Sequence, residues 1–561
     1  MTALRTRRLL AAILALALAL FACGIWWGLP NQFSWAGDEL HPSTWPQAIS
    51  PDSIRGWHTR YPPLHFALLQ GLSLPLRALI DHGVFKLDDL ARVVWLIWFS
   101  RAVSLVMALG TVWLVYRVGR EVYDERSALF AALLTVLVAP LVYYAKMGNL
   151  DAPYLFWFAL SLLFYVRLLK EHRRRDYVLF AAAAAAAVCT KDQAYGLYLL
   201  APIPILIGLG RHAYPERGRL AGIARALVDR RFLAAAATAV AGFAVFQELL
   251  TNPRRFALHV HLLLGPMSED YQDYSGTPTG QWELLRHFLR QVVFVLNPAL
   301  TAVCVAGLLW TAWRAFHYKD RGADDPEDTR EILLLGAIFW LLVSYYLTFL
   351  DLILFSYDRY LLPVALLLAL FGGRLLGALT RPGVRLPWLR WAAVAAGLVY
   401  SLLYAGSVDA RLLADSRYHV EDWLHRHAAP TDDVAAIGRR HHIPRFRWLP
   451  WAKVVRGDGR LIAEERPDFL TVTVSDLRHP EEIDIYQRLA SGELGYRLVL
   501  LYEGKPLFDL LDLDDAGSSQ RFVNPEMAVF KRLPEAPTPG APGGGVSSGP
   551  PPVSDSSDGA E

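Results

Sequence analysis

The sequence predicts an all-α polytopic membrane protein with a small C-terminal α/β domain outside the bilayer. Three observations lead to this prediction. The chain has 561 residues, of which 54% are hydrophobic, and its apolar residues fall into runs near the roughly 20 residues that a helix needs to cross a bilayer. Charged residues gather between these runs. After residue 410 the pattern changes to short segments separated by turns.

The first predicted span, residues 9–29, follows the basic stretch MTALRTRR. Because Phe21 fits a cleavage site poorly and many more spans follow, we expect this span to stay uncleaved. Its basic flank places the N-terminus in the cytoplasm. The later predicted spans are 99–118, 127–145, 152–169, 177–190, 192–210, 232–250, 291–313, 332–350, 359–379 and 389–407. About eleven spans in total place the Arg-rich connections on the cytoplasmic side of an inner (plasma) membrane. They place the C-terminus on the extracytoplasmic side.

Two further apolar segments are not predicted to cross. Residues 64–80 contain Pro75 and Arg77, and a crossing there would turn every later basic connection outward. We therefore expect an interfacial or re-entrant helix, and the same for the Trp-rich residues 90–98. Arg101 is expected only to mark the outer boundary of the second span.

Three domains follow from this pattern. Residues 1–409 form the transmembrane domain, 410–533 an extracytoplasmic α/β domain, and 534–561 a Pro/Gly/Ser-rich tail that is expected to be disordered. Within the second domain, EDWLHRHAAP predicts a helix. The segments VAAIG, DFLTVTVSDL, YRLVLLYE and MAVFKRL predict strands.

Composition excludes several classes of function. The formal net charge of +3 is too small to indicate nucleic-acid binding. Cys23, Cys189 and Cys304 all fall inside apolar runs, so none can form a disulfide in the external domain. No metal-ligand spacing occurs in the sequence.

The connections predicted to be external carry both signs of charge beside apolar spans, where a charge is costly unless it is paired or functional. Each residue alone has an ordinary structural explanation, such as a helix cap or a side chain that snorkels to the interface. The case for a functional site therefore rests on the prediction that all of these residues lie on the extracytoplasmic side of the membrane. The candidates are Asp38, Glu39, His58, Arg60, Tyr61, Asp151, Lys191, Glu248, Arg359 and Tyr360.

The order of five motifs in these connections resembles that of the GT-C superfamily of integral-membrane glycosyltransferases. The motifs are GDELHP, RYPPLHFALL, KMGNLDAPYLFW, TKDQAYGLYLLAP and YDRYLLP. Within the superfamily they are similar to family 39, the protein O-mannosyltransferase-like enzymes, and to the lipid A aminoarabinose transferases. The resemblance covers roughly residues 5–410. It implies a sugar donor carried on a polyprenyl phosphate, and an active site facing away from the cytoplasm.

Under this resemblance, negative charge builds on the leaving phosphate as the sugar is transferred, and cations should meet it. The candidates for binding the donor phosphate are Arg60, Lys191 and Arg359, with Tyr61 and Tyr360 as further hydrogen-bond donors.

The acceptor hydroxyl must lose its proton as it attacks. Asp38, matched to the family's acidic residue in the first external loop, is the expected general base, and Glu39 is expected to orient the acceptor or the surrounding hydrogen bonds. Asp151, His58 and Glu248 are expected to position the sugar or the acceptor. One base with direct attack predicts inversion at the anomeric carbon. A monophosphate leaving group held by protein cations requires no metal, although a divalent cation remains an option.

Two other functions stay open. An oligosaccharyl transferase would use a pyrophosphate donor and depend on a divalent ion, and a non-catalytic carrier or flippase for a lipid-linked sugar would need charges along a path through the bilayer. The expected partners are the polyprenyl-phosphate sugar, the lipid bilayer and an acceptor. The acceptor can be a protein, a lipid or a cell-envelope glycan.

Overall fold

The protein is described from a computed structural model. The described residues are 2–31, 34–50, 61–265, 272–317, 326–383, 386–439, 441–445, 453–455, 462, 464–477, 479–504 and 523–534. The predicted tail lies outside them almost entirely.

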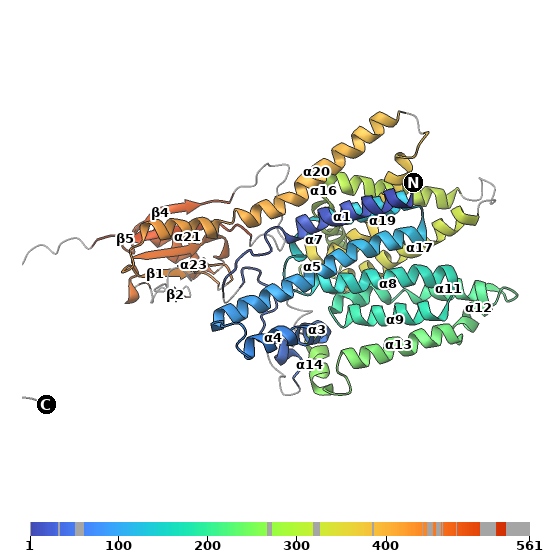
Figure 1. Ribbon diagram of the computed structural model, residues 1–561, viewed down its shortest axis with the longest axis horizontal. Helices are drawn as coiled ribbons and strands as arrows, with labels where there is room; N and C mark the ends of the chain where they lie inside the picture. Colours follow the sequence, from blue (N-terminus) through green and yellow to red (C-terminus); the bar gives the residue numbers. More distant parts are fainter. Residues whose placement is uncertain are drawn as a thin grey trace, which may run out of the picture.

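Long helices run side by side along the length of the molecule, and a small sheet lies beyond one end of them (Figure 1). The helices of this bundle are α1 (Ala3–Ala22), α5 (Asp89–Val122), α6 (Glu125–Val136), α7 (Ala139–Tyr144), α8 (Asp151–Glu171), α9 (Arg174–Val188), α10 (Tyr195–Tyr198), α11 (Pro202–Ala213), α12 (Arg219–Ala226), α13 (Arg230–Phe246), α16 (Pro278–Phe316), α17 (Pro326–Tyr345), α18 (Asp351–Ile353), α19 (Leu362–Leu379) and α20 (Pro387–Leu413). Shorter helices at the end near the sheet are α2 (Thr44–Ala48), α3 (Leu64–Leu72), α4 (Leu74–Asp81) and α14 (Pro253–Leu264).

Seven helical segments of the described chain are long and apolar enough to cross a membrane. They are Asp89–Val122, Asp151–Glu171, Asp192–Ala213, Pro278–Phe316, Pro326–Ile353, Asp358–Leu379 and Pro387–His427. The other four predicted spans are also helical. α6, α9 and α13 have 12, 15 and 17 residues, and the first turns of α1 contain three arginines, Arg5, Arg7 and Arg8. The chain is therefore a multi-pass membrane protein, and the number of about eleven crossings stays a prediction.

The structure refines the two segments that were expected to lie at the interface. Residues 64–81 form two short helices, α3 and α4, which meet at Ser73. Residues 90–98 are not a separate interfacial element, because they are the first turns of the continuous helix α5, which has 34 residues. The prediction of a separate helix there was wrong, since no turn or proline interrupts the apolar pattern before the second span.

Small residues let the helices of the bundle pack closely. A side chain added at Gly373 of α19 would lie 2.5 Å from the backbone nitrogen of Ala131 in α6, and one at Gly377 would overlap Ser127. Close approach of this kind replaces the hydrophobic driving force that helices lack in lipid.

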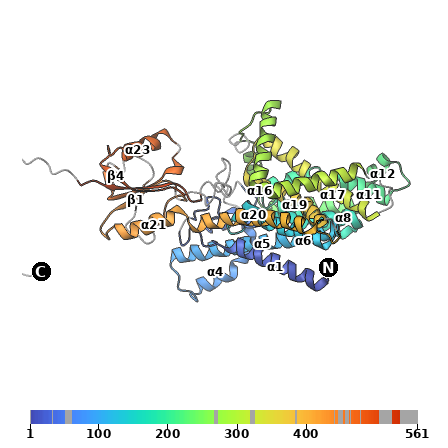
Figure 2. The same cartoon turned by 90° about the horizontal axis from the view of Figure 1, so that it is seen from above.

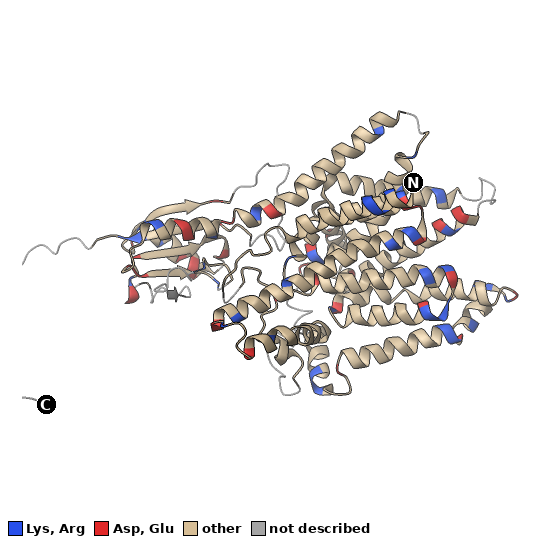
Figure 3. Cartoon of the chain, viewed as in Figure 1, with Lys and Arg blue, Asp and Glu red and all other residues tan. Residues whose placement is uncertain are grey.

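Many lysines and arginines of the helices lie at the end of the bundle that holds the N-terminus, whereas the sheet lies beyond the opposite end (Figure 3). The connections predicted to be cytoplasmic and the C-terminal domain are therefore at opposite ends of the molecule. This arrangement agrees with the alternation from which the spans were predicted.

The C-terminal sheet has five strands in the order β2-β1-β3-β5-β4. Its strands are β1 (Val434–Ile437), β2 (Lys453–Val455), β3 (Phe469–Thr473), β4 (Tyr496–Tyr502) and β5 (Met527–Arg532). β1 is parallel to β2 and β3, while β5 is antiparallel to β3 and β4. The four strands read from the sequence are confirmed.

Helices cover both faces of this sheet (Figure 2). α21 (Ser416–His427) packs its Val420 and Leu424 on one face, and α23 (Pro480–Ala490) packs its Ile485 and Leu489 on the other. Successive side chains of a strand point to opposite faces, so the apolar strands contribute side chains to the hydrophobic core on each face of the sheet. The α/β domain is thus a three-layer sandwich, with the helix predicted in EDWLHRHAAP as one of its outer layers.

Candidate functional site

The loop that carries Asp38 and Glu39 is attached to the C-terminal domain. Trp27 donates from its indole nitrogen to Asp415 at 3.0 Å, and Trp35 donates to the carbonyl oxygen of Ile443 at 2.9 Å. Arg417 lies over both indole rings, at 5.2 Å and 4.2 Å from the ring centroids. Stacked aromatic and guanidinium groups at buried positions fix geometry well. The domain therefore holds one side of the loop.

Glu39 is tied to the bundle by Arg101 of α5. Arg101 is fully buried and donates to both oxygens of Glu39 at 2.7 Å, and the backbone nitrogen of Gly148 donates to Glu39 Oε1, also at 2.7 Å. Burial alone would raise the pKa of Glu39, but Arg101 and these hydrogen bonds hold it below its ordinary value. Arg101 also donates to the Trp27 carbonyl oxygen at 3.0 Å and to Ser34 at 2.9 Å.

The sequence predicted that Arg101 only marks the outer boundary of the second span. That prediction was wrong, because Arg101 is the buried ion-pair partner of Glu39. The loop folds over its side chain and makes it an internal ion-pair partner. Glu39 is correspondingly removed from solvent, with 9% of its surface exposed. This geometry favours the supporting role for Glu39 over direct contact with a substrate.

Asp38 points away from Glu39 and forms an ion pair with Arg359. The Asp38 side chain is 42% exposed and that of Arg359 17% exposed. The guanidinium of Arg359 lies 5.2 Å from the ring centroid of Tyr357, and its Nε has no hydrogen-bond partner among the described residues. Asp38 is thus the accessible acid of the adjacent pair.

Asp151 and Lys191 form a second ion pair. Asp151 begins α8, Lys191 lies between α9 and the short helix η2 (Asp192–Ala194), and their side chains are 2.5 Å apart. Asn149 donates to the second oxygen of Asp151 at 3.3 Å. Burial lowers the pKa of Lys191 to about 8, although the charge of Asp151 opposes this shift.

The buried hydroxyl of Tyr61 is within reach of charges from both ion pairs. Burial raises the pKa of its hydroxyl, and the charge of Asp38 adds to this effect; Asp151 raises it further, while Arg359 lowers it. Residues more than 300 positions apart in the sequence therefore act on one hydroxyl. Tyr360, the neighbour of Arg359, accepts a hydrogen bond on its carbonyl oxygen from Tyr345 at 2.9 Å.

The remaining sequence candidates are His58, Arg60 and Glu248. His58 and Arg60 lie outside the described residues. Glu248 follows α13 with a backbone φ of 56°, and its Oε2 is buried without a hydrogen-bond partner among the described residues. No described contact joins Glu248 to Asp38 or Asp151.

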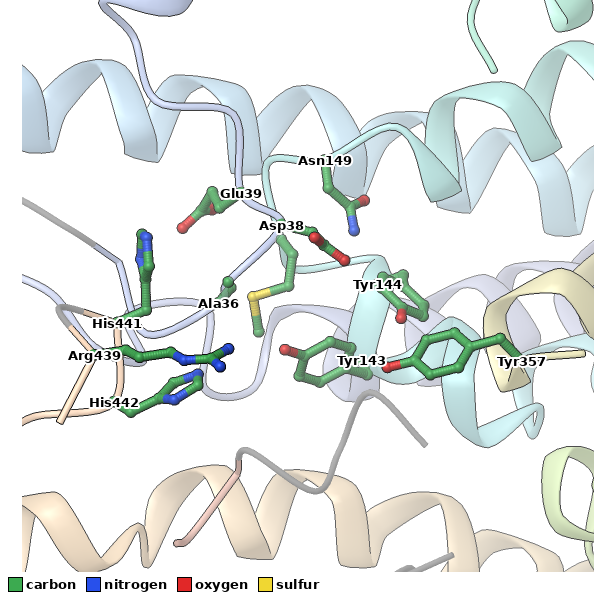
Figure 4. Close-up of a pocket in the computed structure, with 12 residues that line it drawn as sticks. Ala36, Asp38, Glu39, Tyr143, Tyr144, Asn149, Tyr357, Arg439, His441 and His442 are labelled. Carbon is green, nitrogen blue, oxygen red and sulfur yellow. The ribbon is translucent and has the colours of Figure 1, made fainter. Parts of the chain in front are cut away.

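A cavity of about 220 Å³ opens beside Asp38 (Figure 4). Its wall combines three segments of the bundle with one of the C-terminal domain. The lining residues are Ala36, Gly37, Asp38, Glu39, Tyr143, Tyr144, Met147, Asn149, Tyr357, Arg439, His441 and His442. Among the described residues, no group of three or more His, Cys, Asp or Glu side chains is arranged to hold a metal ion.

Sequence analysis missed helix α14, which buries two basic residues, Arg255 and His259, close to Lys191. Arg255 of α14 is fully buried and donates to the carbonyl oxygen of Tyr61 at 3.1 Å, and His259 lies 3.0 Å from Asp192. These two residues are four positions apart and share a helix face. The signal was readable, because Asn252 followed by a proline is a typical helix start, and Asn252 does cap this helix.

Residues 94–250 match the family described as dolichyl-phosphate-mannose-protein mannosyltransferase. This match confirms the resemblance to membrane glycosyltransferases that the loop motifs predicted. Among solved structures, the apo oligosaccharyltransferase of Archaeoglobus fulgidus is 13% identical, with a TM-score of 0.44, and the match covers 78% of this chain and 63% of that one. ArnT from Cupriavidus metallidurans bound to undecaprenyl phosphate is 14% identical, with a TM-score of 0.43, over 94% of this chain and 98% of that one.

This chain thus spans less than two thirds of the length of the oligosaccharyltransferase. A comparison with curated proteins found no match.

Proposed function

We propose, from the mannosyltransferase family match and the paired charges beside Tyr61, that this chain transfers a sugar from a polyprenyl-phosphate donor to an acceptor hydroxyl. The observation that carries the proposal is the proximity of two ion pairs, Asp38 with Arg359 and Asp151 with Lys191, whose charges act on one another and on the Tyr61 hydroxyl. Acids and cations that meet at the edge of a membrane domain need a functional or structural reason. Transfer of a sugar from a phosphate needs cations that bind the phosphate and a carboxylate that accepts the proton of the acceptor hydroxyl.

The donor phosphate is bound by Lys191 and Arg359, with hydrogen bonds from Tyr61 and Tyr360 and from Arg60. Arg359 supplies planar donors suited to two phosphate oxygens, and Lys191 supplies a compact charge in a desolvated position. These cations stabilise the negative charge that grows on the leaving phosphate.

Asp38 is the general base. When the donor phosphate binds Arg359, it shares that cation with the Asp38 carboxylate and leaves a carboxylate oxygen available to the acceptor hydroxyl. The acceptor oxygen attacks the anomeric carbon while its proton passes to Asp38, and the bond from that carbon to the phosphate oxygen breaks. The polyprenyl phosphate leaves with the bonding electrons, and attack from the opposite side inverts the anomeric configuration.

The other site residues position the reactants. Glu39, held by Arg101, fixes the backbone next to Asp38. Asp151 orients the Lys191 ammonium or binds a sugar hydroxyl, and His58 and Glu248 are assigned to the sugar or the acceptor. The reaction takes place on the extracytoplasmic face of the inner membrane, with a protein, a lipid or a glycan as acceptor.

Donor binding is expected to weaken as the pH rises above about 8. Lys191, with its pKa of about 8, carries its positive charge below that pH and loses it above. The phosphodiester of the donor keeps its charge over this range, so affinity should fall by up to roughly tenfold per pH unit. Equilibrium binding of a labelled polyprenyl-phosphate sugar to the purified protein between pH 7 and 9.5 measures this.

Lys191→Arg is the matched control for this titration, because a guanidinium stays protonated throughout the range. The variant should bind the donor with little dependence on pH. A wild-type affinity that is flat between pH 7 and 9.5 would remove Lys191 from the phosphate site.

Removal of divalent ions is expected to leave turnover of the monophosphate donor within about twofold of its original rate, because protein cations neutralise a single phosphate. The measurement compares polyprenyl-monophosphate and polyprenyl-pyrophosphate sugars with and without EDTA. Consumption of the pyrophosphate donor alone, lost on chelation and restored by a divalent ion, would favour an oligosaccharyl transferase.

A further inference from the structure

The cavity beside Asp38 has an outer wall that comes from the C-terminal domain. Arg439, His441 and His442 follow strand β1 and face the bundle across this space (Figure 4). Hydrogen bonds hold two of these residues in place. His441 contacts the carbonyl oxygen of Ser34 through Nδ1 at 2.8 Å, and the His442 carbonyl oxygen accepts from Thr473 at 2.9 Å.

The acids on the bundle side of the cavity each have an arginine partner of their own. Glu39 pairs with Arg101, and Asp38 pairs with Arg359. The positive charge of the outer wall is therefore not needed to neutralise them. Arg439 of the outer wall has an ion pair of its own with Asp476, at 3.5 Å, and a cation held this loosely beside a cavity is suited to an incoming anion.

Arg439 is the most accessible cation of the outer wall. Its side chain is 55% exposed, and its ion pair with Asp476 is long, at 3.5 Å. Asp476 also lies 3.0 Å from His442 Nδ1 and accepts from the Arg439 backbone nitrogen at 2.9 Å. The end of the Arg439 side chain points into the cavity toward Tyr143 (Figure 4). Asp476 thus holds the base of the arginine while its terminal nitrogens face the space next to Asp38.

We propose that Arg439 binds a phosphate ester of the acceptor, in the cavity that His441 and His442 also line, and so places a neighbouring hydroxyl at Asp38. The inference rests on the proposed function, because it assigns the acceptor side of the same reaction. An arginine offers paired donors that match phosphate oxygens. At about 220 Å³, the cavity is smaller than the roughly 300–1,000 Å³ that encloses a whole drug-sized ligand. It therefore takes one small head group of the acceptor.

Two matched pairs of hydroxyl compounds test this assignment with the full-length protein in detergent micelles. Glycerol 3-phosphate and glycerol form the soluble pair, and phosphatidylglycerol and diacylglycerol form the lipid pair. The wild type is expected to bind the phosphate-bearing member of at least one pair more tightly by on the order of tenfold. Preference in the soluble pair indicates a free phosphate ester, and preference in the lipid pair alone indicates a lipid head group.

Arg439→Gln is expected to abolish this preference with an unchanged thermal unfolding midpoint, since its side chain is largely exposed. Arg497→Gln, an exposed arginine of β4 in the same domain, is the matched control and should keep the preference. The inference is overturned if the wild type prefers the phosphate-bearing member of neither pair, or if Arg439→Gln keeps the preference. Absence of sugar transfer from any donor would contradict the proposed function instead, because the binding comparison is scored without turnover.

Discussion

Asp38→Asn is expected to lower the rate of sugar transfer by roughly 10²–10⁴-fold, the usual contribution of a general base. The amide keeps the size of the side chain but accepts no proton from the attacking hydroxyl. Donor affinity should stay at or above the wild-type value, because the Arg359 guanidinium no longer shares its charge with the Asp38 carboxylate. Initial rates of transfer and equilibrium binding of the same labelled donor measure the two effects separately.

Asp81→Asn is the matched control, since Asp81 is an exposed acid at the end of α4 that pairs with Arg92 on the surface. This variant should retain wild-type turnover. Turnover by purified Asp38→Asn at the wild-type rate would show that another group removes the proton.

Arg101→Leu is expected to destabilise the protein by roughly 3–5 kcal/mol, because it leaves the Glu39 carboxylate buried without its cation. Both side chains of this pair are almost fully buried, at 0% and 2% exposure. The loop that carries Asp38 would lose its attachment to α5, so transfer should fail together with folding. Thermal unfolding in one detergent, followed for wild type and variant, measures the loss.

Arg92→Leu removes an ion pair as well, but its side chain and that of Asp81 are 45% and 58% exposed. Exposed pairs contribute about 0–1 kcal/mol. The two substitutions should therefore differ clearly in unfolding midpoint. Equal midpoints would mean that the pair of Glu39 with Arg101 does not support the loop.

Much of the fold was readable from the sequence because a membrane forces apolar residues into long helices. The strands β1, β3, β4 and β5 were also readable, since each has an apolar run bounded by turns. β2 was missed because it has only 3 residues. Helix α23 was missed too, although Pro480 follows a capping position at its start.

The sequence predicted which residues belong to the candidate site, but it did not predict which acid forms an ion pair with which cation. Apolar runs place Asp38 and Arg359 at one end of the bundle, yet 321 residues separate them. Which cation meets which acid depends on how the loops fold, and this is fixed by side-chain packing. The burial of Arg101 depends on how the loop that carries Glu39 folds over it, and the approach of Arg439 depends on the docked C-terminal domain. The local sequence gives no sign of either.

The most direct test of the proposed transfer is to incubate membranes that contain the protein with polyprenyl-monophosphate sugars labelled in the sugar. The label should leave the lipid and appear in an acceptor, with release of polyprenyl phosphate, and membranes carrying Asp38→Asn should show neither change. If the label stays on every monophosphate donor, or moves equally well with Asp38→Asn, the proposed chemistry at Asp38 is contradicted.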